Sequence, residues 1–267
     1  MLSSMHLSAA GRLILSLSLA FPLISHGAEI SARGTDGRGL EKADRSPTPL
    51  IAPASTEAEI RIKQFKVPPG FKVDLFAAEP MLANPVAFSI DEKNRFYVAE
   101  THRYRSSVLD IRNYMFMLED DLASRTVEDR AAMSRRNFGA QAKDLEIETE
   151  VIRFIEDRSG SGKADFSTVF ADGFSTILDG IGSGVLARKG KVWFTNIPEL
   201  WMLDGPDSNG KSTKRESLSH GYGVHFSLTG HDMHGLTFGP DGKLYFSFGD
   251  RGANVRTKEG KTLYFPG

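Results

Sequence analysis

A repeated strand–turn–strand pattern constrains the fold of this chain more than any other feature of its sequence. In each copy, a short apolar segment is followed by a polar turn and then by a segment rich in β-branched and aromatic residues, which is the pattern of a β-hairpin. The three copies are Pro85–Glu100, Gly184–Asn196 and Leu236–Asp250. When the turns are aligned on Asn94, Gly190 and Gly242, the successive copies are 96 and 52 residues apart. The shorter interval is therefore one structural repeat, and the longer interval is about two.

A second motif is interleaved with the first. Ile155–Phe174 is similar to Met202–Tyr222, and their glycines Gly162 and Gly210 are 48 residues apart. Two hairpins in every ~50 residues is the arithmetic of a four-stranded propeller blade. We therefore predict an all-β fold of the β-propeller type. A β-sandwich is the alternative, although a sandwich would show no such fixed period.

The long first interval contains a predicted helical insert. Between residues 110 and 137 apolar side chains recur at helical spacing, and Thr126 with Asp129 matches a capping box that opens a second helix. The remaining sequence is long enough for three to four blades. Because Thr262–Gly267 has the pattern of half a strand pair, we expect residues 60–267 to be a partial β-propeller, truncated at its C-terminus, rather than a closed ring of four blades.

The first 59 residues lack the repeat. Residues 1–27 hold a single basic residue, Arg12, and an apolar run of 12 residues, Leu13–Ile24, followed by small residues. The run is too short to span a bilayer, so this segment is predicted to be a secretory signal peptide, with an uncleaved anchor as the alternative. Residues 28–59 are rich in Ser, Thr, Pro, Gly and charged residues, which predicts a disordered linker. The expected location is periplasmic or secreted, and membrane association is compatible with it.

Charge and cysteine content exclude several classes of function. The 33 Lys and Arg residues are balanced by 34 Asp and Glu, for a net charge of −1, so the surplus of basic groups that nucleic-acid binding requires is missing. Without cysteine, these residues form no disulfide, thiolate zinc site, iron–sulfur cluster or covalent haem attachment. We expect no nucleic-acid partner and no membrane span beyond the signal peptide.

The candidate chemistry lies in the segment that holds His220, His225, His231 and His234. His231 and His234 open a predicted inner strand and Asp250 follows the same hairpin, so all three are expected at one mouth of the central channel, where propellers bind ligands. A histidine beside a carboxylate is suited to take a proton from an alcohol. Two alternatives stay open. The first is a zinc site, for which the side chains of His231 and His234 would have to converge, although strand geometry points them to opposite faces. The second is that both histidines are structural residues with satisfied hydrogen bonds.

A weaker candidate is a calcium loop. Asp157 and Asp165 have the early spacing of such a loop, but its twelfth position is Thr168, where a bidentate Glu is expected. These two carboxylates are therefore weak candidate ligands for Ca²⁺. A hairpin turn rich in Asp, Ser and Gly explains the same residues.

Three longer segments resemble a known protein family. They are Gly70–Arg105, Asp110–Met133 and Gly230–Val255. They resemble the N-terminal domain of the membrane-bound dehydrogenases of planctomycete- and verrucomicrobial-type bacteria, and the resemblance covers nearly all of the chain from residue 60. That family is distantly similar to the soluble sugar dehydrogenases that use pyrroloquinoline quinone (PQQ) on a six-bladed propeller. The resemblance implies that this chain holds the first blades of such a domain.

The resemblance also implies an activity. The chain would be the N-terminal part of an extracytoplasmic, quinone-dependent dehydrogenase that oxidises a sugar or another alcohol, with His231 as the general base. Residues expected near the cofactor are Asp232, His234, Asp250, Arg251 and Asn254. Gly230 stands where the sugar dehydrogenases carry an Asp, so the carboxylate that orients His231 would be Asp232 or come from elsewhere.

The implied cofactors are PQQ and Ca²⁺, and the implied electron acceptor is a cytochrome c or a haem c module downstream of this chain. We expect little turnover from this chain alone, because later blades of the family are not part of it. The alternative function is a propeller that binds glycans or proteins and has no chemistry.

Overall fold

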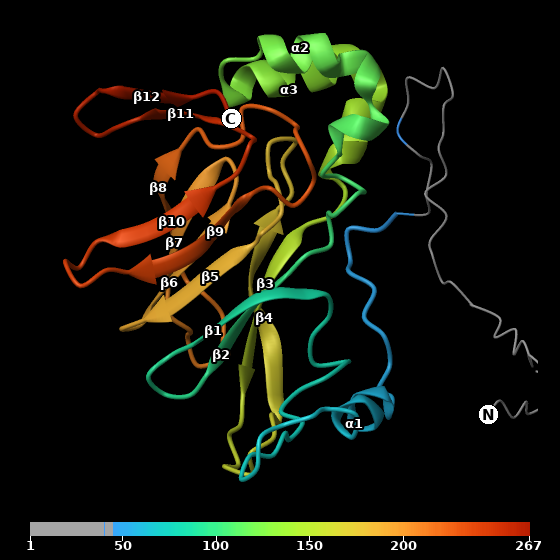
Figure 1. Cartoon of the computed structure of the whole chain (residues 1–267), viewed down its shortest axis with the longest axis vertical. Coiled ribbons are helices and arrows are strands. Elements are labelled where there is room, and N and C mark those ends of the chain that lie inside the picture. The colour runs from blue at the N-terminus through green and yellow to red at the C-terminus, as the bar shows by residue number, and fades with distance from the viewer. Residues whose placement is uncertain (1–39, 41–44) are drawn as a thin grey trace, which may run out of the picture. The chain divides into compact units, whose positions relative to one another are not determined.

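Antiparallel β-sheet is the main regular structure in what the computed structural model describes, which is Leu40 and residues 45–267 (Figure 1). The first sheet has the order β1 (Pro85–Ile90), β2 (Phe96–Glu100), β3 (Glu150–Glu156), β4 (Phe166–Phe174). The second has the order β5 (Gly184–Arg188), β6 (Lys191–Asn196), β7 (Glu199–Asp204), β8 (Arg215–His220). Two separate hairpins follow, β9 (Met233–Phe238) with β10 (Leu244–Phe248), and β11 (Ala253–Arg256) with β12 (Thr262–Phe265). The prediction of an all-β fold is confirmed, whereas the predicted signal peptide and most of the predicted linker lie outside the described residues.

The repeated hairpins are present where the sequence predicts them. Strand β1 pairs with β2, β5 with β6 and β10 with β9. The three turn residues aligned above all have a positive φ, which is 59° at Asn94, 72° at Gly190 and 76° at Gly242. Glycine adopts this left-handed conformation freely and asparagine does so at little cost. The aligned residues therefore supply the same left-handed backbone conformation in three separate turns.

The first strands of the three units lie next to one another. Strand β1 lies beside β5, and β5 lies beside β9 (Figure 1). The Ala187 backbone N–H donates to Ser89 Oγ over 2.9 Å, and the Ser183 hydroxyl donates to the Met233 carbonyl over 2.6 Å. At the C-terminal ends of these strands, the Lys189 N–H donates to Glu92 and Arg188 lies over the ring of Phe238, so β1, β5 and β9 run in the same direction and begin at the same end of the sheets.

Aromatic side chains fill the space between the two four-stranded sheets. Tyr97 meets Phe154 and Phe170 edge to face, and Phe174 meets Phe194 with ring centroids 4.8 Å apart. All five side chains are buried in one apolar cluster. The core between the sheets is built from one face of each, because alternate residues of a strand point to opposite faces.

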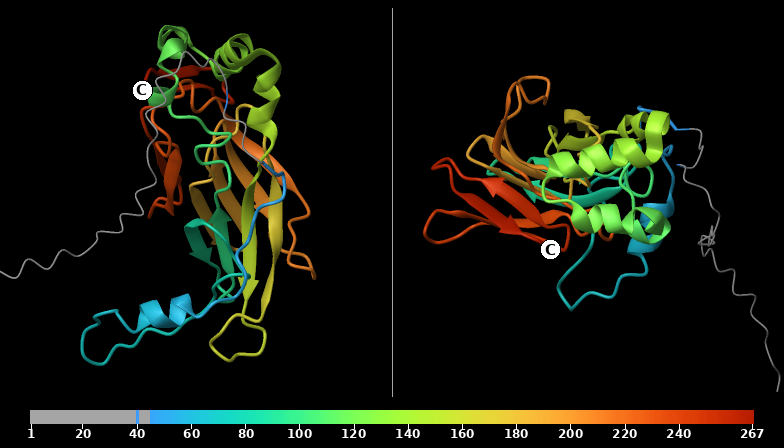
Figure 2. Two further views of the ribbon diagram at one scale, coloured as in Figure 1. Left: turned by 90° about the vertical axis from the view of Figure 1, so that its right-hand side faces the viewer. Right: turned by 90° about the horizontal axis from the view of Figure 1, so that it is seen from above.

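The predicted insert is helical. It comprises the 3₁₀ turns η1 (Ile111–Asn113) and η2 (Met115–Met117), the helices α2 (Leu118–Ala123) and α3 (Val127–Phe138), and a 3₁₀ segment η3 (Gly139–Glu146). The predicted capping box is present, because the Asp129 N–H donates to Thr126 Oγ1 over 3.1 Å and the Thr126 N–H donates to Asp129 Oδ2 over 3.0 Å. The helices cover the end of the sheets where β1, β5 and β9 begin, and α1 (Glu57–Ile62) lies toward the other end (Figure 2).

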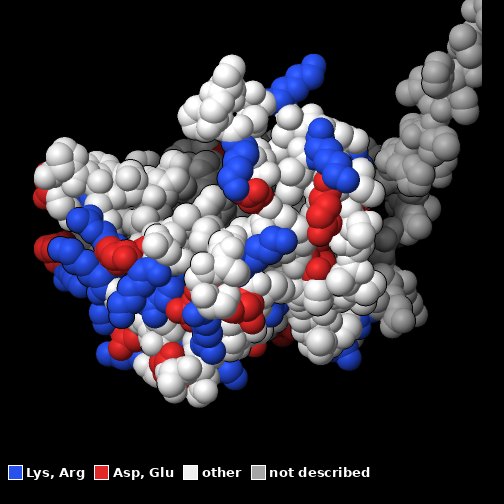
Figure 3. Space-filling model, turned by 90° about the horizontal axis from the view of Figure 1, so that it is seen from below, with Lys and Arg blue, Asp and Glu red and all other residues white. Residues whose placement is uncertain are grey.

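That other end is polar and of mixed charge. In the space-filling view of this end, lysine and arginine side chains are interspersed with aspartate and glutamate (Figure 3). In the part of the chain that the structure describes, none of the helices has the length and apolar character needed to cross a bilayer.

Candidate functional site

A histidine and an aspartate form a hydrogen-bonded pair at the end of the sheets beneath the helices. His231 lies two residues before β9 and Asp250 two residues after β10, and His231 Nδ1 lies 3.0 Å from Asp250 Oδ1. Their side chains are 49% and 44% exposed. A carboxylate can only accept, so Nδ1 carries the proton and the exposed ring keeps its free lone pair on Nε2. We call His231 and Asp250 the exposed pair.

Gly249 lets the two segments of the exposed pair come close together. A Cβ at this position would lie 2.9 Å from the His231 carbonyl oxygen and 3.0 Å from its Cβ. Ordinary side chains do not tolerate such a contact with backbone, so only glycine permits this approach. The sequence Gly249-Asp250 after a strand is therefore a structural requirement of the pair.

A second pair lies directly behind the first. Arg251 Nη1 donates to Asp232 Oδ1 over 2.9 Å, and Arg251 Nε donates to the His225 carbonyl over 3.1 Å. The side chains of Asp232 and Arg251 are 0% and 3% exposed. We call Asp232 and Arg251 the buried pair. The carboxylate partner of His231 is thus Asp250, and Asp232 is engaged with Arg251 instead.

The other predicted residues have separate partners. His234 lies on the exposed side of β9, where its Nδ1 is 3.3 Å from Ser247 Oγ. The Asn254 amide donates to the Arg125 carbonyl in the insert over 2.8 Å. Within the described residues, no group of three or more His, Cys, Asp or Glu side chains could hold a metal ion.

A buried charge cluster between the insert and this end of the sheets was not predicted from the sequence. Arg130 of α3 is fully enclosed, donates to the Leu178 carbonyl over 2.8 Å, and lies beside the buried pair. Burial, reinforced by the charge of Arg251, lowers the pKa of Arg130 to about 9. Burial likewise raises the pKa of Asp179 in the same cluster. The capping box identified α3, but a cap does not reveal which polar side chains of a helix face other parts of the chain.

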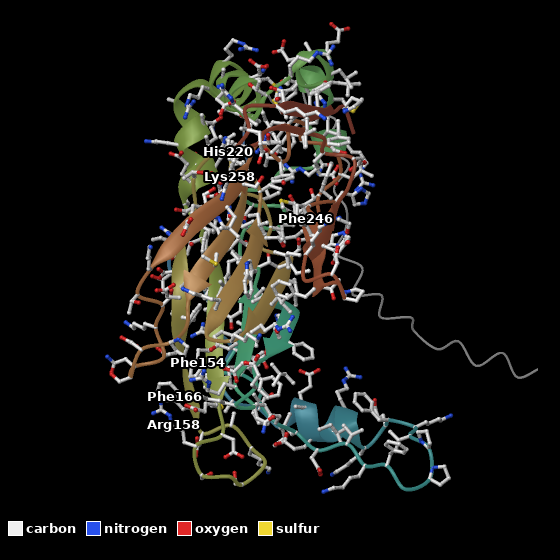
Figure 4. All side chains as sticks on the ribbon, turned by 90° about the vertical axis from the view of Figure 1, so that its left-hand side faces the viewer. Phe154, Arg158, Phe166, His220, Phe246 and Lys258 are labelled. Atoms are coloured by element: carbon white, nitrogen blue, oxygen red, sulfur yellow. The ribbon has the colours of Figure 1, made fainter. Side chains whose placement is uncertain are left out.

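The calcium-loop candidates lie in the turn between β3 and β4. Asp157 accepts from the backbone N–H groups of Ser161 and Gly162, and Asp165 accepts from those of Arg158 and Ser159. The carboxylates thus close a hairpin turn, as the alternative interpretation predicts. Arg158 stacks on Phe166 in this turn, far from His220 at the other end of the sheets (Figure 4).

The residues implied by the resemblance do not form a site for PQQ. A planar quinone with three carboxylates needs cationic or N–H donors that are free to face it. Arg251 is the cation of the predicted set, but its guanidinium is buried and occupied by Asp232 and the His225 carbonyl. The amide of Asn254 is occupied by the insert. What the site offers instead is an exposed imidazole with an oriented carboxylate.

Comparison with known proteins gives a family without an assigned activity. A family model described as Domain of unknown function (DUF7133) matches residues 57–266. No curated protein and no solved structure matches this chain.

Proposed function

Since the chain belongs to the family described as Domain of unknown function (DUF7133), we propose a function from its exposed pair and from the dehydrogenases that its sequence resembles. The chain is a β-propeller-type domain of an extracytoplasmic dehydrogenase that oxidises a hydroxyl group of a sugar or another alcohol. His231 is its general base, and Asp250 orients the base.

The observation that carries the proposal is the hydrogen bond from His231 to Asp250. It fixes the proton on Nδ1 and leaves Nε2, on a ring that is half exposed, to accept the proton of a substrate hydroxyl. The carboxylate then stabilises the imidazolium that results.

Oxidation of an alcohol also requires a two-electron acceptor. The resemblance suggests PQQ, which would supply a two-electron acceptor if it were bound, and a cytochrome c as the next electron acceptor. Because Arg251 and Asp232 are occupied with each other, the acceptor would have to be held by other residues. No step through the cofactor follows from the residues described above.

The arrangement of the strands supports the finer fold proposal. Two four-stranded antiparallel sheets and a third hairpin have their first strands side by side and in the same direction. This is the relation between neighbouring blades of a propeller. The helical insert lies between the first blade's β2 and β3, which explains the doubled interval between the first two repeats.

The experiment that tests the proposal is dye reduction by the purified chain, supplied with PQQ, Ca²⁺ and a panel of sugars and simple alcohols. We expect His231→Ala to lower the rate by about 10²- to 10⁴-fold, the usual contribution of a general base. His220→Ala is the matched control, since His220 also pairs with a carboxylate, Glu199, over 2.6 Å at the same end. Because only a low rate is expected from this chain alone, the ratio of the two rates is the decisive quantity, and equal rates with and without His231 would contradict the proposal.

A cavity favours the second candidate, a binding module without chemistry. It measures about 630 Å³ and lies between the segment 45–50 and the end of the first sheet. Its charged lining residues, Arg45 and Glu148, are paired over 2.5 Å and neutralise each other. Hydroxyl groups of Thr101 and Ser106 and the ring of Tyr104 also line it. A neutral polyhydroxylated ligand suits such a lining, because it can exchange hydrogen bonds and stack on an aromatic ring.

Titration calorimetry with neutral sugars distinguishes the two candidates. Under the binding hypothesis, Tyr104→Ala weakens binding at least about tenfold, whereas Tyr245→Ala does not, although the two tyrosines are similarly exposed. Binding that is unchanged in Tyr104→Ala would place the ligand elsewhere.

A further inference from the structure

We propose that the buried pair, Asp232 with Arg251, is a positioning device that fixes the hydrogen bond between His231 and Asp250. The inference deepens the proposed function, on which the catalytic meaning of the bond rests. Its own evidence is the geometry of the two pairs, and its test uses no turnover measurement.

The two pairs connect the same two segments of chain. His231 and Asp232 are consecutive residues before β9, and Asp250 and Arg251 are consecutive residues after β10. The first residues of the two segments, His231 and Asp250, bond on the solvent side over 3.0 Å, and the second residues, Asp232 and Arg251, bond on the inner side over 2.9 Å. Any slip of one segment against the other would break both bonds.

The exposed pair does not hold itself in place. Each of its side chains is nearly half exposed, and a polar contact so accessible to water contributes little to the order of its own groups. The buried pair differs because both its side chains are removed from water. A charge-assisted hydrogen bond between buried groups is strong, and separating the groups would leave two charges unpaired in the interior.

The buried pair is itself anchored to a third segment. Arg251 makes two hydrogen bonds with His225. The His225 N–H donates to the Arg251 carbonyl over 2.8 Å, and the Arg251 side chain donates through Nε to the His225 carbonyl. On the other side, Asp232 lies against Gly180, where a Cβ would come within 2.6 Å of its Oδ1. Asp232 and Arg251 therefore have little room to move.

The insert fastens this third segment. His225 Nδ1 donates to the Asp121 carbonyl over 2.8 Å, and the Phe226 N–H donates to Asp121 Oδ1 over 2.8 Å. A chain of contacts therefore leads from α2 through residues 225–226 to Arg251, and from Arg251 to Asp232, which is next to His231 in sequence. A helical element far away in sequence thus sets the position of the candidate base.

The test is a ¹⁵N NMR measurement of the His231 ring, whose two nitrogen shifts report which nitrogen carries the proton. In the unaltered chain we expect one tautomer, with the proton on Nδ1. The double variant Asp232→Asn/Arg251→Met removes both charges at once, so that no buried charge is left alone. We expect its ring to lose the Nδ1-protonated form as the dominant species, although His231 and Asp250 are both still present.

A matched control is Glu100→Gln/Arg153→Met. Glu100 and Arg153 form a pair with the same separation of 2.9 Å, also buried, between β2 and β3. We expect this control to leave the His231 tautomer unchanged. Arg251→Lys is a second variant in case the double variant fails to fold; it keeps the charge and loses the planar fork that reaches both Asp232 and His225, and we expect a mixture of tautomers.

An unchanged His231 tautomer in the folded double variant, or in Arg251→Lys, would overturn the proposal. An equal change in the Glu100/Arg153 control would overturn it too, since the effect would then be general loosening. Failure of the proposed function has a separate readout, which is an unchanged rate of dye reduction in His231→Ala.

Discussion

His220 shows how a single side chain can make the stability of this protein depend on pH. Its Nδ1 lies 2.6 Å from Glu199 Oε1, and its Nε2 lies 3.3 Å from Glu128 Oε1 of α3. The hydrogen bond to Glu199, followed by the charges of both glutamates, raises the pKa of His220. A raised pKa means that the folded state binds the proton more tightly than the unfolded state does.

We therefore expect His220 to stabilise the protein below its unfolded pKa of about 6.5, and this contribution to disappear as the pH rises through the higher folded pKa. His220→Gln should lower the free energy of unfolding at pH 5.5 by up to about 1 kcal/mol, since the side chain is 46% exposed. Urea unfolding at pH 5.5 and pH 9 measures this. A difference that grows toward pH 9 would have the wrong sign.

Asp250→Asn should separate orientation of the base from binding of the substrate. An asparagine amide can donate to Nδ1 and so hold the ring in the wrong tautomer, with the proton on Nε2. If the proposed function is right, kcat falls by up to about 10⁴-fold while KM changes little. Asp241→Asn, in the turn of the same hairpin, is the control that should leave kcat unaltered. Dye-reduction kinetics over a range of substrate concentrations give kcat and KM for each variant.

At the scale of the element, the capping box of α3 ties helix stability to its first turn. Thr126→Ala removes the hydroxyl that accepts from the Asp129 N–H, and we expect a loss of about 1 kcal/mol in the free energy of unfolding. Thr126→Ser keeps the hydroxyl and should lose less than half as much. Urea unfolding followed by circular dichroism gives both values. Equal losses would mean that the methyl group, and not the cap, matters at this position.

The elements differ in how fully the sequence predicts them. The hairpin turns at Asn94, Gly190 and Gly242 were predictable because the left-handed backbone restricts the residues that a turn accepts. The capping box was predictable because both its partners lie within three residues of each other. Both the turn residues and the capping box depend only on residues close together in sequence, so they can be recognised without knowing the tertiary structure.

The candidate site was predictable only in part. The proximity of His231 and Asp250 follows from the hairpin that joins them. The burial of Asp232 and Arg251 does not, because it depends on Gly180 and on residues of the insert that are far away in sequence. A polar side chain next to a candidate catalytic residue looks like a ligand-binding residue until its surroundings are known.

At the scale of the whole molecule, the two faces of the first sheet should contribute very differently to stability. Phe194 of β6 is fully buried against that sheet, whereas Phe88 of β1 is 64% exposed on its other face. We expect Phe194→Ala to lower the free energy of unfolding by about 3–5 kcal/mol and Phe88→Ala by less than about 1 kcal/mol. Urea unfolding of the two variants under one condition measures the ratio. Comparable losses would show that a partner covers Phe88 in solution.

Because β1, β5 and β9 all begin at one end of the sheets, the molecule has a front and a back. The helical insert lies at the front, while the back carries hairpin turns, among them the short ones at Gly190 and Gly242, where an added Cβ would meet nothing within 4 Å. These turns are natural attachment points. A fluorophore or an affinity peptide grafted there would let the protein be immobilised or followed in a cell with its front left open.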